Sequence, residues 1–220
     1  MRTIAAIYTG VALVKPLSDQ LKEALPGYRI MNILDDSMIA EIIAEGKLTP
    51  PVRRRLYSYY DAAASAGAEL ILNTCSSIGE AVYAAREFIP VPIVRIDEAM
   101  ARRAVMEASR IAVLATLSTT LDPTLDLVRR CAEEAGRRVE AISAVAQGAF
   151  QAITAGDAAT HDRFVAETAA TVAADCDLIL LAQGSMARME EPLRALTGKT
   201  VYSSPRLAIE MIKRLLEGKN

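Results

Sequence analysis

The residue best suited to chemistry in this sequence is Cys75, which ends an apolar run and is followed by two hydroxyl residues. In the stretch "AELILNTCSSIGEA" (residues 68–81), the apolar run reads as a buried strand, and a helix-like pattern begins just after Cys75. A thiol at a helix start lies near unpaired backbone N–H groups and the positive end of the helix dipole, which favour the thiolate. The same donors, with the hydroxyls of Ser76 and Ser77, suit a carboxylate ligand. We therefore expect a reactive thiol at Cys75; the alternative is a buried, inert cysteine.

The pattern around Cys75 occurs a second time in the chain. The segments "LILNTCSSI" (70–78) and "LILLAQGSM" (178–186) share their apolar positions at an offset of 108 residues, which pairs Cys75 with Gln183. Two further pairs of segments overlay at 108 and 107 residues, namely "PIVRIDEAMARRAV" with "KTVYSSPRLAIEMI" and "IAAIYTG" with "IAVLATL". Three blocks in the same order predict two similar halves. The alternative is that two unrelated segments align by hydrophobicity alone.

Apolar runs of strand length alternate with longer segments of helical period along both halves. The runs lie at residues 3–10, 28–34, 68–75, 91–96, 110–116, 138–145, 177–183 and 199–204. Most lack polar alternation, which is typical of parallel strands covered by helices on both faces. We therefore predict two pseudo-symmetric α/β domains with parallel sheets. The first spans residues 1–96 together with a C-terminal helix at 205–220, and the second spans 97–204.

This architecture predicts where a ligand would bind. Ligands of parallel α/β sheets lie at the carboxyl ends of the strands, so we expect Cys75 and Gln183 to face one cleft between the domains. Polar residues also follow the first strand of each half. They are Thr9 in the first half and Ser118, Thr119 and Thr120 in the second. Their hydroxyl and N–H groups could bind a carboxylate, and helix capping is the alternative role for them.

Composition excludes several classes of partner. The 25 basic and 27 acidic residues give a formal net charge of −2, without the basic excess that a nucleic-acid surface needs. No apolar run approaches the roughly 18 residues that span a membrane, and the N-terminal sequence lacks a signal-peptide core. We expect a cytoplasmic protein. Cys75, Cys131 and Cys176 form no CxxC pair, so they indicate neither a metal site nor a disulfide framework.

The remaining histidine and cysteines are expected to have structural roles. His161 is the only histidine and lies in the polar stretch "GDAATHDRFVAET", so we predict a solvated or capping role away from the strand ends. Cys131 falls on or beside the apolar stripe of an amphipathic helix, and Cys176 just precedes a strand. Both are expected to be packing residues.

Taken together, the two-half organisation, the "NTCSSIGEA" turn and the equivalent "LLAQGSM" turn resemble the aspartate/glutamate/hydantoin racemase superfamily. The resemblance covers nearly the whole chain, including "SAGAELILNTCSS", "RIAVLATLSTT" and "ITAGDAATHDRFVAE". It implies two pseudo-symmetric α/β domains with an active site between them and no cofactor. In the racemases of the superfamily, one cysteine thiolate removes the proton α to a carboxylate and a facing cysteine returns it. Related members with altered cysteines decarboxylate or isomerise small dicarboxylates.

The resemblance carries over only in part. The first cysteine corresponds to Cys75, but the position of the second is Gln183, whose amide has no acid–base chemistry near neutral pH. Tyr8 replaces an acidic residue of the glutamate racemases, and Ser76 replaces an asparagine. Substrate-binding positions carry over to Ser76, Ser77, Gly184 and Ser185. A symmetrical two-base racemisation is therefore disfavoured.

The sequence predicts an isomerase-like or decarboxylase-like enzyme in which Cys75 acts on one side of a small carboxylate, as acid, base or nucleophile. Gln183 would donate a hydrogen bond to a substrate oxygen. The alternative is a noncatalytic carboxylate-binding or regulatory protein that lost the second thiol. Members of the superfamily are often dimers or larger, so we expect a homo-oligomer. The sequence does not select the substrate.

Overall fold

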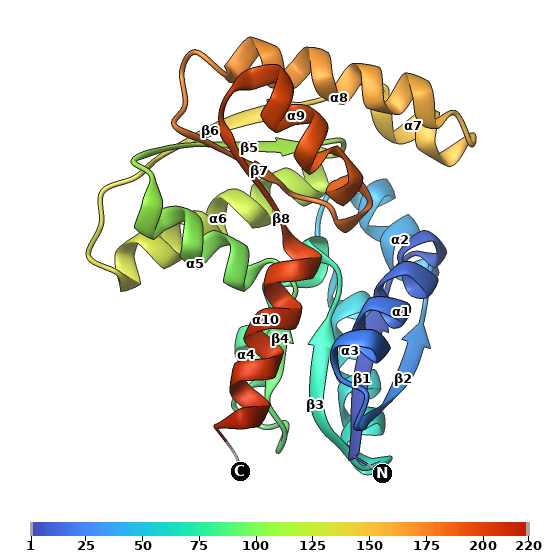
Figure 1. The fold of residues 1–220 in the computed structure, drawn as a ribbon. Helices are drawn as coiled ribbons and strands as arrows, with labels where there is room; N and C mark the ends of the chain where they lie inside the picture. Colours follow the sequence, from blue (N-terminus) through green and yellow to red (C-terminus); the bar gives the residue numbers. More distant parts are fainter. Residues whose placement is uncertain (1, 219–220) are drawn as a thin grey trace. The chain divides into compact units, whose positions relative to one another are not determined.

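The computed structural model describes residues 2–218, which form two compact units. The first unit contains residues 2–96 and 205–218, and the second contains residues 97–204. Each unit has a four-stranded sheet with helices around it (Figure 1). The predicted α/β class with parallel sheets is confirmed.

The sheet of the first unit consists of β1 (Arg2–Tyr8), β2 (Tyr28–Leu34), β3 (Ala68–Asn73) and β4 (Ile93–Arg95). The strands are parallel and lie in the order β2-β1-β3-β4. The helices of this unit are α1 (Val14–Ala24), α2 (Ser37–Glu45), α3 (Pro50–Ser65), α4 (Ala81–Ala85) and α10 (Ser204–Glu217). Two short 3-10 helices, η1 (Val11–Leu13) and η2 (Ser76–Ile78), follow the ends of β1 and β3.

Both faces of this sheet are buried, which explains why its strands lack polar alternation. Alternate residues of β1 point to opposite faces. Ala5 and Ile7 pack in one core cluster with α2, α3 and α4, whereas Ile4 and Ala6 pack in another with α1 and α10. Local sequence also sets both ends of α3. Thr49 caps its start by accepting a hydrogen bond from Val52, and Gly67, with φ 84°, turns the chain into β3.

The second unit repeats this arrangement. Its strands are β5 (Arg110–Ala115), β6 (Glu140–Val145), β7 (Leu178–Leu181) and β8 (Thr200–Ser203), all parallel in the order β6-β5-β7-β8. The helices are α5 (Glu98–Glu107), α6 (Ser118–Glu134), α7 (Ala149–Thr154), α8 (Ala158–Val172) and α9 (Glu190–Thr197), with the 3-10 helix η3 (Gly184–Met189) after β7. The strands of the second sheet follow the same order as their counterparts in the first sheet. The repeat seen in the sequence is therefore present in the fold.

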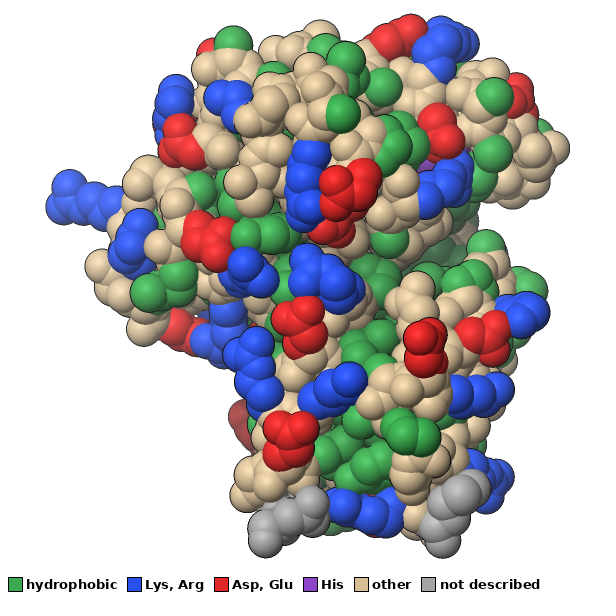
Figure 2. All heavy atoms as spheres, in the orientation of Figure 1, with side chains coloured by type: hydrophobic (Ala, Val, Ile, Leu, Met, Phe, Trp, Pro, Cys, Tyr) green, Lys and Arg blue, Asp and Glu red, His purple; other side chains and the backbone are tan. Residues whose placement is uncertain are grey.

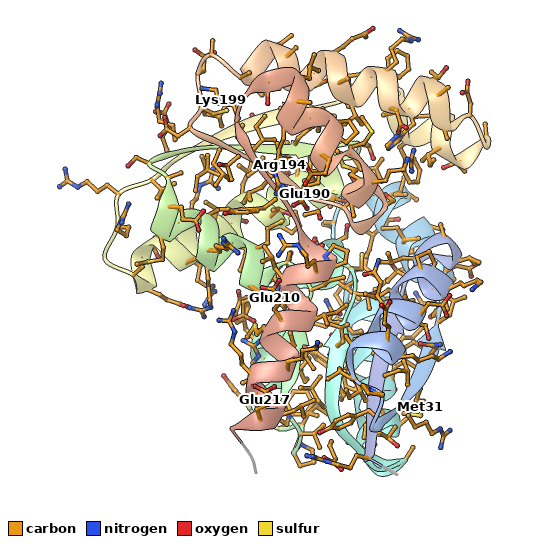
Figure 3. All side chains as sticks on the ribbon, viewed as in Figure 1. Met31, Glu190, Arg194, Lys199, Glu210 and Glu217 are labelled. Atoms are coloured by element: carbon orange, nitrogen blue, oxygen red, sulfur yellow. The ribbon has the colours of Figure 1, made fainter. Side chains whose placement is uncertain are left out.

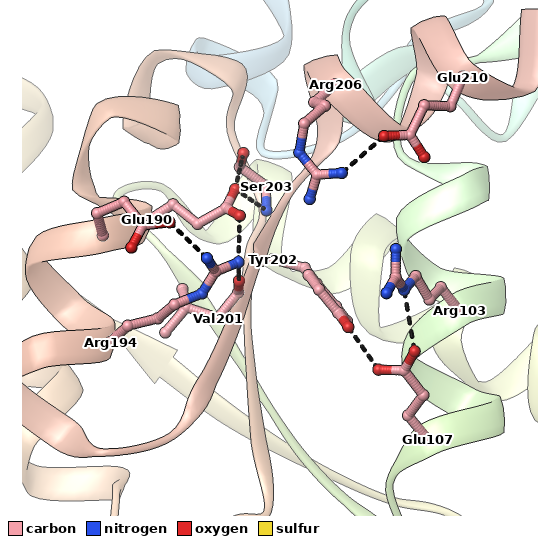
Figure 4. A network of polar contacts seen from close by, with 10 residues as sticks. Arg103, Glu107, Glu190, Arg194, Val201, Tyr202, Ser203, Arg206 and Glu210 are labelled. Carbon is pink, nitrogen blue, oxygen red and sulfur yellow. Dashed lines mark hydrogen bonds and ion pairs between the residues drawn. The ribbon is translucent and has the colours of Figure 1, made fainter.

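Polar contacts fasten the last strand of the second unit to α9. Glu190 and Arg194 point toward one another on this helix (Figure 3). Glu190 Oε2 accepts hydrogen bonds from Ser203 N at 3.1 Å and from Ser203 Oγ at 2.5 Å, and Arg194 Nη2 donates to Val201 O at 2.8 Å (Figure 4). Glu190, which directly follows η3, is thereby hydrogen-bonded to Ser203 at the end of β8.

Charged side chains of both signs are interspersed on the face drawn in Figure 2. Some oppositely charged residues pair one helical turn apart, such as Arg103 with Glu107 and Arg206 with Glu210 (Figure 4). No helix within residues 2–218 is both long and apolar enough to cross a membrane. The surface charge is therefore balanced locally and does not gather by sign on that face.

Candidate active site

The turn that carries Cys75 begins where β3 ends. Thr74 continues the pairing to β1, since its backbone N and its Oγ1 both donate to Ile7 O, at 3.1 and 2.9 Å. Cys75 itself is extended, with φ −128° and ψ 125°, and the 3-10 helix η2 follows. The α-helix expected directly after Cys75 is therefore wrong: α4 starts only at Ala81. A three-residue helix supplies little macrodipole, so N–H groups and hydroxyls remain as the local donors.

Cys75 is partly buried and packs against the core cluster that includes residues of α3 and α4. Burial raises the pKa of the Cys75 thiol, while hydrogen bonds from Thr9, from the N–H and hydroxyl of Ser77 and from the N–H of Ile78 act in the opposite direction. Desolvation outweighs these donors. Burial thus opposes the predicted preference for the thiolate, while the hydroxyl and N–H groups around the sulfur favour it.

Two residues that the sequence analysis did not identify, Tyr60 and Asn73, support the backbone at Cys75 through hydrogen bonds. Tyr60 Oη donates to Asn73 Oδ1 at 2.8 Å, and Asn73 Nδ2 donates to the carbonyl of Cys75 at 3.0 Å. Both side chains are buried, and burial raises the pKa of Tyr60 far above its usual value. The chain from Tyr60 through Asn73 fixes the backbone at Cys75.

The structure places three of the predicted binding residues of the first unit around this turn. Thr9 follows the end of β1 and is buried, and Ser76 and Ser77 are buried in η2. Thr9 and Ser77 interact with the Cys75 sulfur itself. The hydroxyls that the sequence predicted as carboxylate ligands therefore also serve the thiol.

Gln183 follows β7 in the second unit and is bound to Thr116, the residue after β5. Its Oε1 accepts hydrogen bonds from Thr116 N at 2.7 Å and Thr116 Oγ1 at 3.0 Å, and its Nε2 donates to the same hydroxyl at 2.8 Å. Thr116 occupies the place that Thr9 has in the first unit (116 − 9 = 107, the offset of the repeat). A threonine hydroxyl thus forms a hydrogen bond with Cys75 in the first unit and with Gln183 in the second.

The other predicted residues of the second unit lie on two elements beside this pair. Ser118, Thr119 and Thr120 form the first turn of α6, and Gly184 and Ser185 begin η3. The capping residue of α6 is Leu117, so none of the three hydroxyl residues caps this helix. Thr119 Oγ1 is buried and has no hydrogen-bond partner among the described residues.

His161 is not solvated, contrary to the prediction. It is fully buried, because it starts the inner stripe of α8 that continues with Val165 and Ala169. Its Nδ1 lies 2.7 Å from Asp162 Oδ1, and Asp162 pairs with Arg188 of η3. The histidine is therefore linked to the element that follows Gln183. Cys131 and Cys176 are buried, as packing residues should be.

Within residues 2–218, no three His, Cys, Asp or Glu side chains are grouped as a metal site would require. The donors near Cys75 are hydroxyls, backbone N–H groups and a thiol, which suit an anion. The chemistry available from these residues is proton transfer or nucleophilic attack by sulfur, with hydroxyl and amide donors around the developing charge.

Comparison with known sequences identifies one family. A sequence model described as "Asp/Glu/Hydantoin racemase" matches residues 5–212, almost the whole chain. No protein with a curated description matches the chain by sequence.

Solved structures with the same fold include racemases and a decarboxylase. Glutamate racemase isoform RacE1 from Bacillus anthracis has a TM-score of 0.78 and 16% identity, covering 100% of this chain and 83% of that chain. Allantoin racemase from Klebsiella pneumoniae has a TM-score of 0.71 and 18% identity, covering 99% and 88%. A Gly74Cys mutant of arylmalonate decarboxylase has a TM-score of 0.64 and 19% identity, covering 99% and 94%. At these identities, the likeness establishes the fold.

Proposed function

Because the chain belongs to the Asp/Glu/hydantoin racemase family of enzymes, we propose that it is a cofactor-independent enzyme acting on a small carboxylate, with Cys75 as a one-sided proton carrier. The reaction class we propose is isomerisation or decarboxylation. The observation that carries this proposal is the position of Cys75: its thiol follows the carboxyl end of β3, with Thr9, Ser77 and Ile78 as hydrogen-bond donors to its sulfur.

A protonated thiol is suited to one step in particular. Loss of CO₂ from a malonate-like acid leaves a carbanion or enediolate in the site. The S–H bond of Cys75 then breaks as a C–H bond forms on one face of that carbon, and the charge passes to sulfur. Hydrogen bonds from Thr9, Ser77 and Ile78 stabilise the thiolate that results. Burial, which raises the pKa of the Cys75 thiol, favours retention of the proton on sulfur until that step.

We assign Gln183 a different role from that of a second cysteine. Its carbonyl oxygen accepts hydrogen bonds from Thr116, and its Nε2 group, which donates one N–H to Thr116 Oγ1, has a second N–H that can donate to a ligand. The proposed carboxylate-binding residues are Thr9, Ser76 and Ser77 in the first unit and Ser118, Thr119, Thr120, Gly184 and Ser185 in the second. We further propose that the protein is cytoplasmic, since all three cysteines are free. We also propose a homo-oligomer, as the resemblance to the superfamily implies.

The experiment is a screen of α-substituted, malonate-like and unsaturated diacids in D₂O, followed by NMR. We expect deuterium at one face of the product carbon, and therefore one enantiomer from a prochiral malonate. Cys75→Ser should lower turnover by about 10²–10⁴-fold, the usual contribution of a general acid. Cys131→Ala is the matched control, because Cys131 is packed in a helix of the second unit. Turnover in Cys75→Ser equal to that of the unmodified protein, or a racemic product, would overturn the proposal.

A further inference from the structure

Arg95 is a charged side chain buried in the first unit, with only 2% of its surface exposed. It is the last residue of β4 and lies in register with Asn73 of β3, the strand that leads to Cys75. A guanidinium remains charged at any ordinary pH, and burying a charge is costly. A buried arginine beside the candidate site therefore needs an explanation in terms of what it contacts.

The guanidinium of Arg95 lies against the backbone of Gly79. A Cβ atom at Gly79 would come within 2.5 Å of Arg95 Cζ, 2.6 Å of Nη2 and 2.7 Å of Nε. Real Cβ atoms essentially never come this close to another atom, so a side chain at residue 79 would displace the guanidinium. Gly79 also closes the turn that carries Cys75, because its N–H donates to Ser76 O at 2.9 Å.

The other side of the Arg95 guanidinium is held by α4. Its Nη1 donates to Tyr83 Oη at 3.3 Å, and its Cζ lies 5.4 Å from the centre of the Tyr83 ring. A second arginine, Arg86, lies over the same ring at 5.7 Å but bonds to the carbonyl of Ile93 at 2.8 and 2.9 Å. Both arginines join α4 to β4, yet it is Arg95 whose guanidinium lies on Gly79.

We propose that Arg95 is a positioning residue for Cys75: its guanidinium, packed on Gly79 and bonded to Tyr83, holds the turn of residues 75–79 in place. The N–H groups of Ser77 and Ile78 that face the sulfur belong to this turn. The inference rests on the proposed role of Cys75. It adds a support to the site that acts through the turn and does not contact substrate.

Arg95 also places a positive charge near Tyr60, which interacts with Cys75. The Tyr60 hydroxyl interacts electrostatically with both Arg95 and Cys75, as well as with Tyr57 and Arg86. The groups that face the sulfur directly are Thr9, Ser77 and Ile78. Loss of the guanidinium should therefore disfavour the Cys75 thiolate in two ways: the donors of the turn move, and a nearby positive charge is removed.

The test measures the alkylation of Cys75 by iodoacetamide as a function of pH, with each cysteine followed separately by peptide mass spectrometry. Arg95→Met keeps the length of the side chain and removes the charge and the fork of donors. We expect the midpoint of its Cys75 profile to rise by about one pH unit. Arg95→Lys, which restores the charge, should recover part of the shift. Arg2→Met, at the opposite end of β1 from Thr9 and paired with Glu69, is the control and should leave the midpoint unchanged.

A second variant, Gly79→Ala, displaces the Arg95 guanidinium but keeps its charge in the protein. It therefore tests the position of the guanidinium separately from the presence of its charge. We expect the midpoint to rise in this variant too. A midpoint for Arg95→Met equal to that of the unmodified protein, or a Gly79→Ala midpoint that does not move, would overturn the inference. Since the readout is thiol reactivity, it fails or succeeds independently of whether Cys75 supports turnover.

Discussion

The side chain of Gln183 is bonded at both ends of its amide to Thr116, through the backbone N–H and the hydroxyl of that threonine. In the first unit the equivalent threonine, Thr9, hydrogen-bonds the sulfur of Cys75. The two halves of the repeat therefore use the same threonine to orient different groups. One group carries a proton, and the other can only donate or accept a hydrogen bond.

Changing Gln183 to Glu tests whether the amide serves a carboxylate ligand. The carboxylate can still accept from Thr116 N–H, but it replaces the Nε2 donor with a charged acceptor. We expect kcat/KM for an anionic substrate from the D₂O screen to fall at least about tenfold, because like charges brought together cost several kcal/mol. Gln147→Glu is the matched control, since Gln147 is exposed just after β6 and lacks the Thr116 contact. Equal losses in both variants would contradict the role of Gln183.

Removing the hydroxyl of Thr9 should make Cys75 harder to ionise. The hydrogen bond from Thr9 lowers the pKa of the thiol, so Thr9→Val should raise that pKa further. A hydrogen bond worth about 1 kcal/mol corresponds to a shift of about 0.5–1 pH unit in the alkylation midpoint. Thr3→Val, on the same strand but outside the site, is the control and should not change the profile. A midpoint unmoved in Thr9→Val would show that the hydroxyl does not serve the sulfur.

The pH dependence of Cys75 alkylation in the unmodified protein can also be predicted. Because burial raises the pKa of this thiol, alkylation should begin at higher pH than for an unperturbed cysteine, whose pKa is about 8.5. Rapid labelling at mildly acidic pH would instead indicate a stabilised thiolate. The measurement uses a short model peptide containing one cysteine as the reference, with the rate compared at each pH.

The strands and the repeat could be predicted because burial on both faces leaves a direct trace in the sequence. A parallel strand such as β7 is apolar throughout, and the two halves keep similar apolar runs in the same order. The turn after Cys75 could not be predicted at the same level. A three-residue 3-10 helix and the first turn of an α-helix have nearly the same local pattern, so periodicity does not distinguish them.

The supports of the site escaped prediction because they come from other strands and helices. Arg95 comes beside the turn through the pairing of β3 with β4, and Tyr60 reaches Asn73 from α3. A signal for Arg95 was present, since it is the one charge within the apolar run "VPIVRI". His161 carried a similar signal, because its spacing to Val165 and Ala169 matches one face of a helix.

Two buried tyrosines of the first unit should respond oppositely to loss of the hydroxyl. Tyr8 Oη is buried without a hydrogen-bond partner among the described residues, so Tyr8→Phe should raise the free energy of unfolding by about 1 kcal/mol. Tyr60→Phe should lower it by about 1–3 kcal/mol, since Asn73 loses its donor. Denaturant titration at pH 7 measures both changes. The same direction of change in the two variants would contradict the prediction.

The same tyrosines predict a loss of stability in alkali. Burial raises the pKa of both side chains in the folded state, whereas an unfolded tyrosine ionises near pH 10. Below about pH 10 both states hold the protons, so the stability is fully present. Above it the unfolded state releases protons that the folded state keeps, and the free energy of unfolding falls. Tyr8→Phe should flatten this decline between about pH 10 and 11.

The pair of glutamates that begins α9 offers a test of how η3 is anchored. Glu190 accepts two hydrogen bonds from Ser203 and pairs with Arg194, whereas Glu191 pairs with Arg194 from an exposed position, with 79% of its side chain accessible. Glu190→Ala leaves the buried N–H and hydroxyl of Ser203 without their acceptor, so the free energy of unfolding should fall by about 1–3 kcal/mol. Glu191→Ala should change it by less than about 1 kcal/mol, as expected for a surface ion pair. Since Glu190 directly follows η3, its loss should also increase amide hydrogen exchange at residues 184–189. Comparable exchange in the two variants would show that this contact does not hold the turn after Gln183.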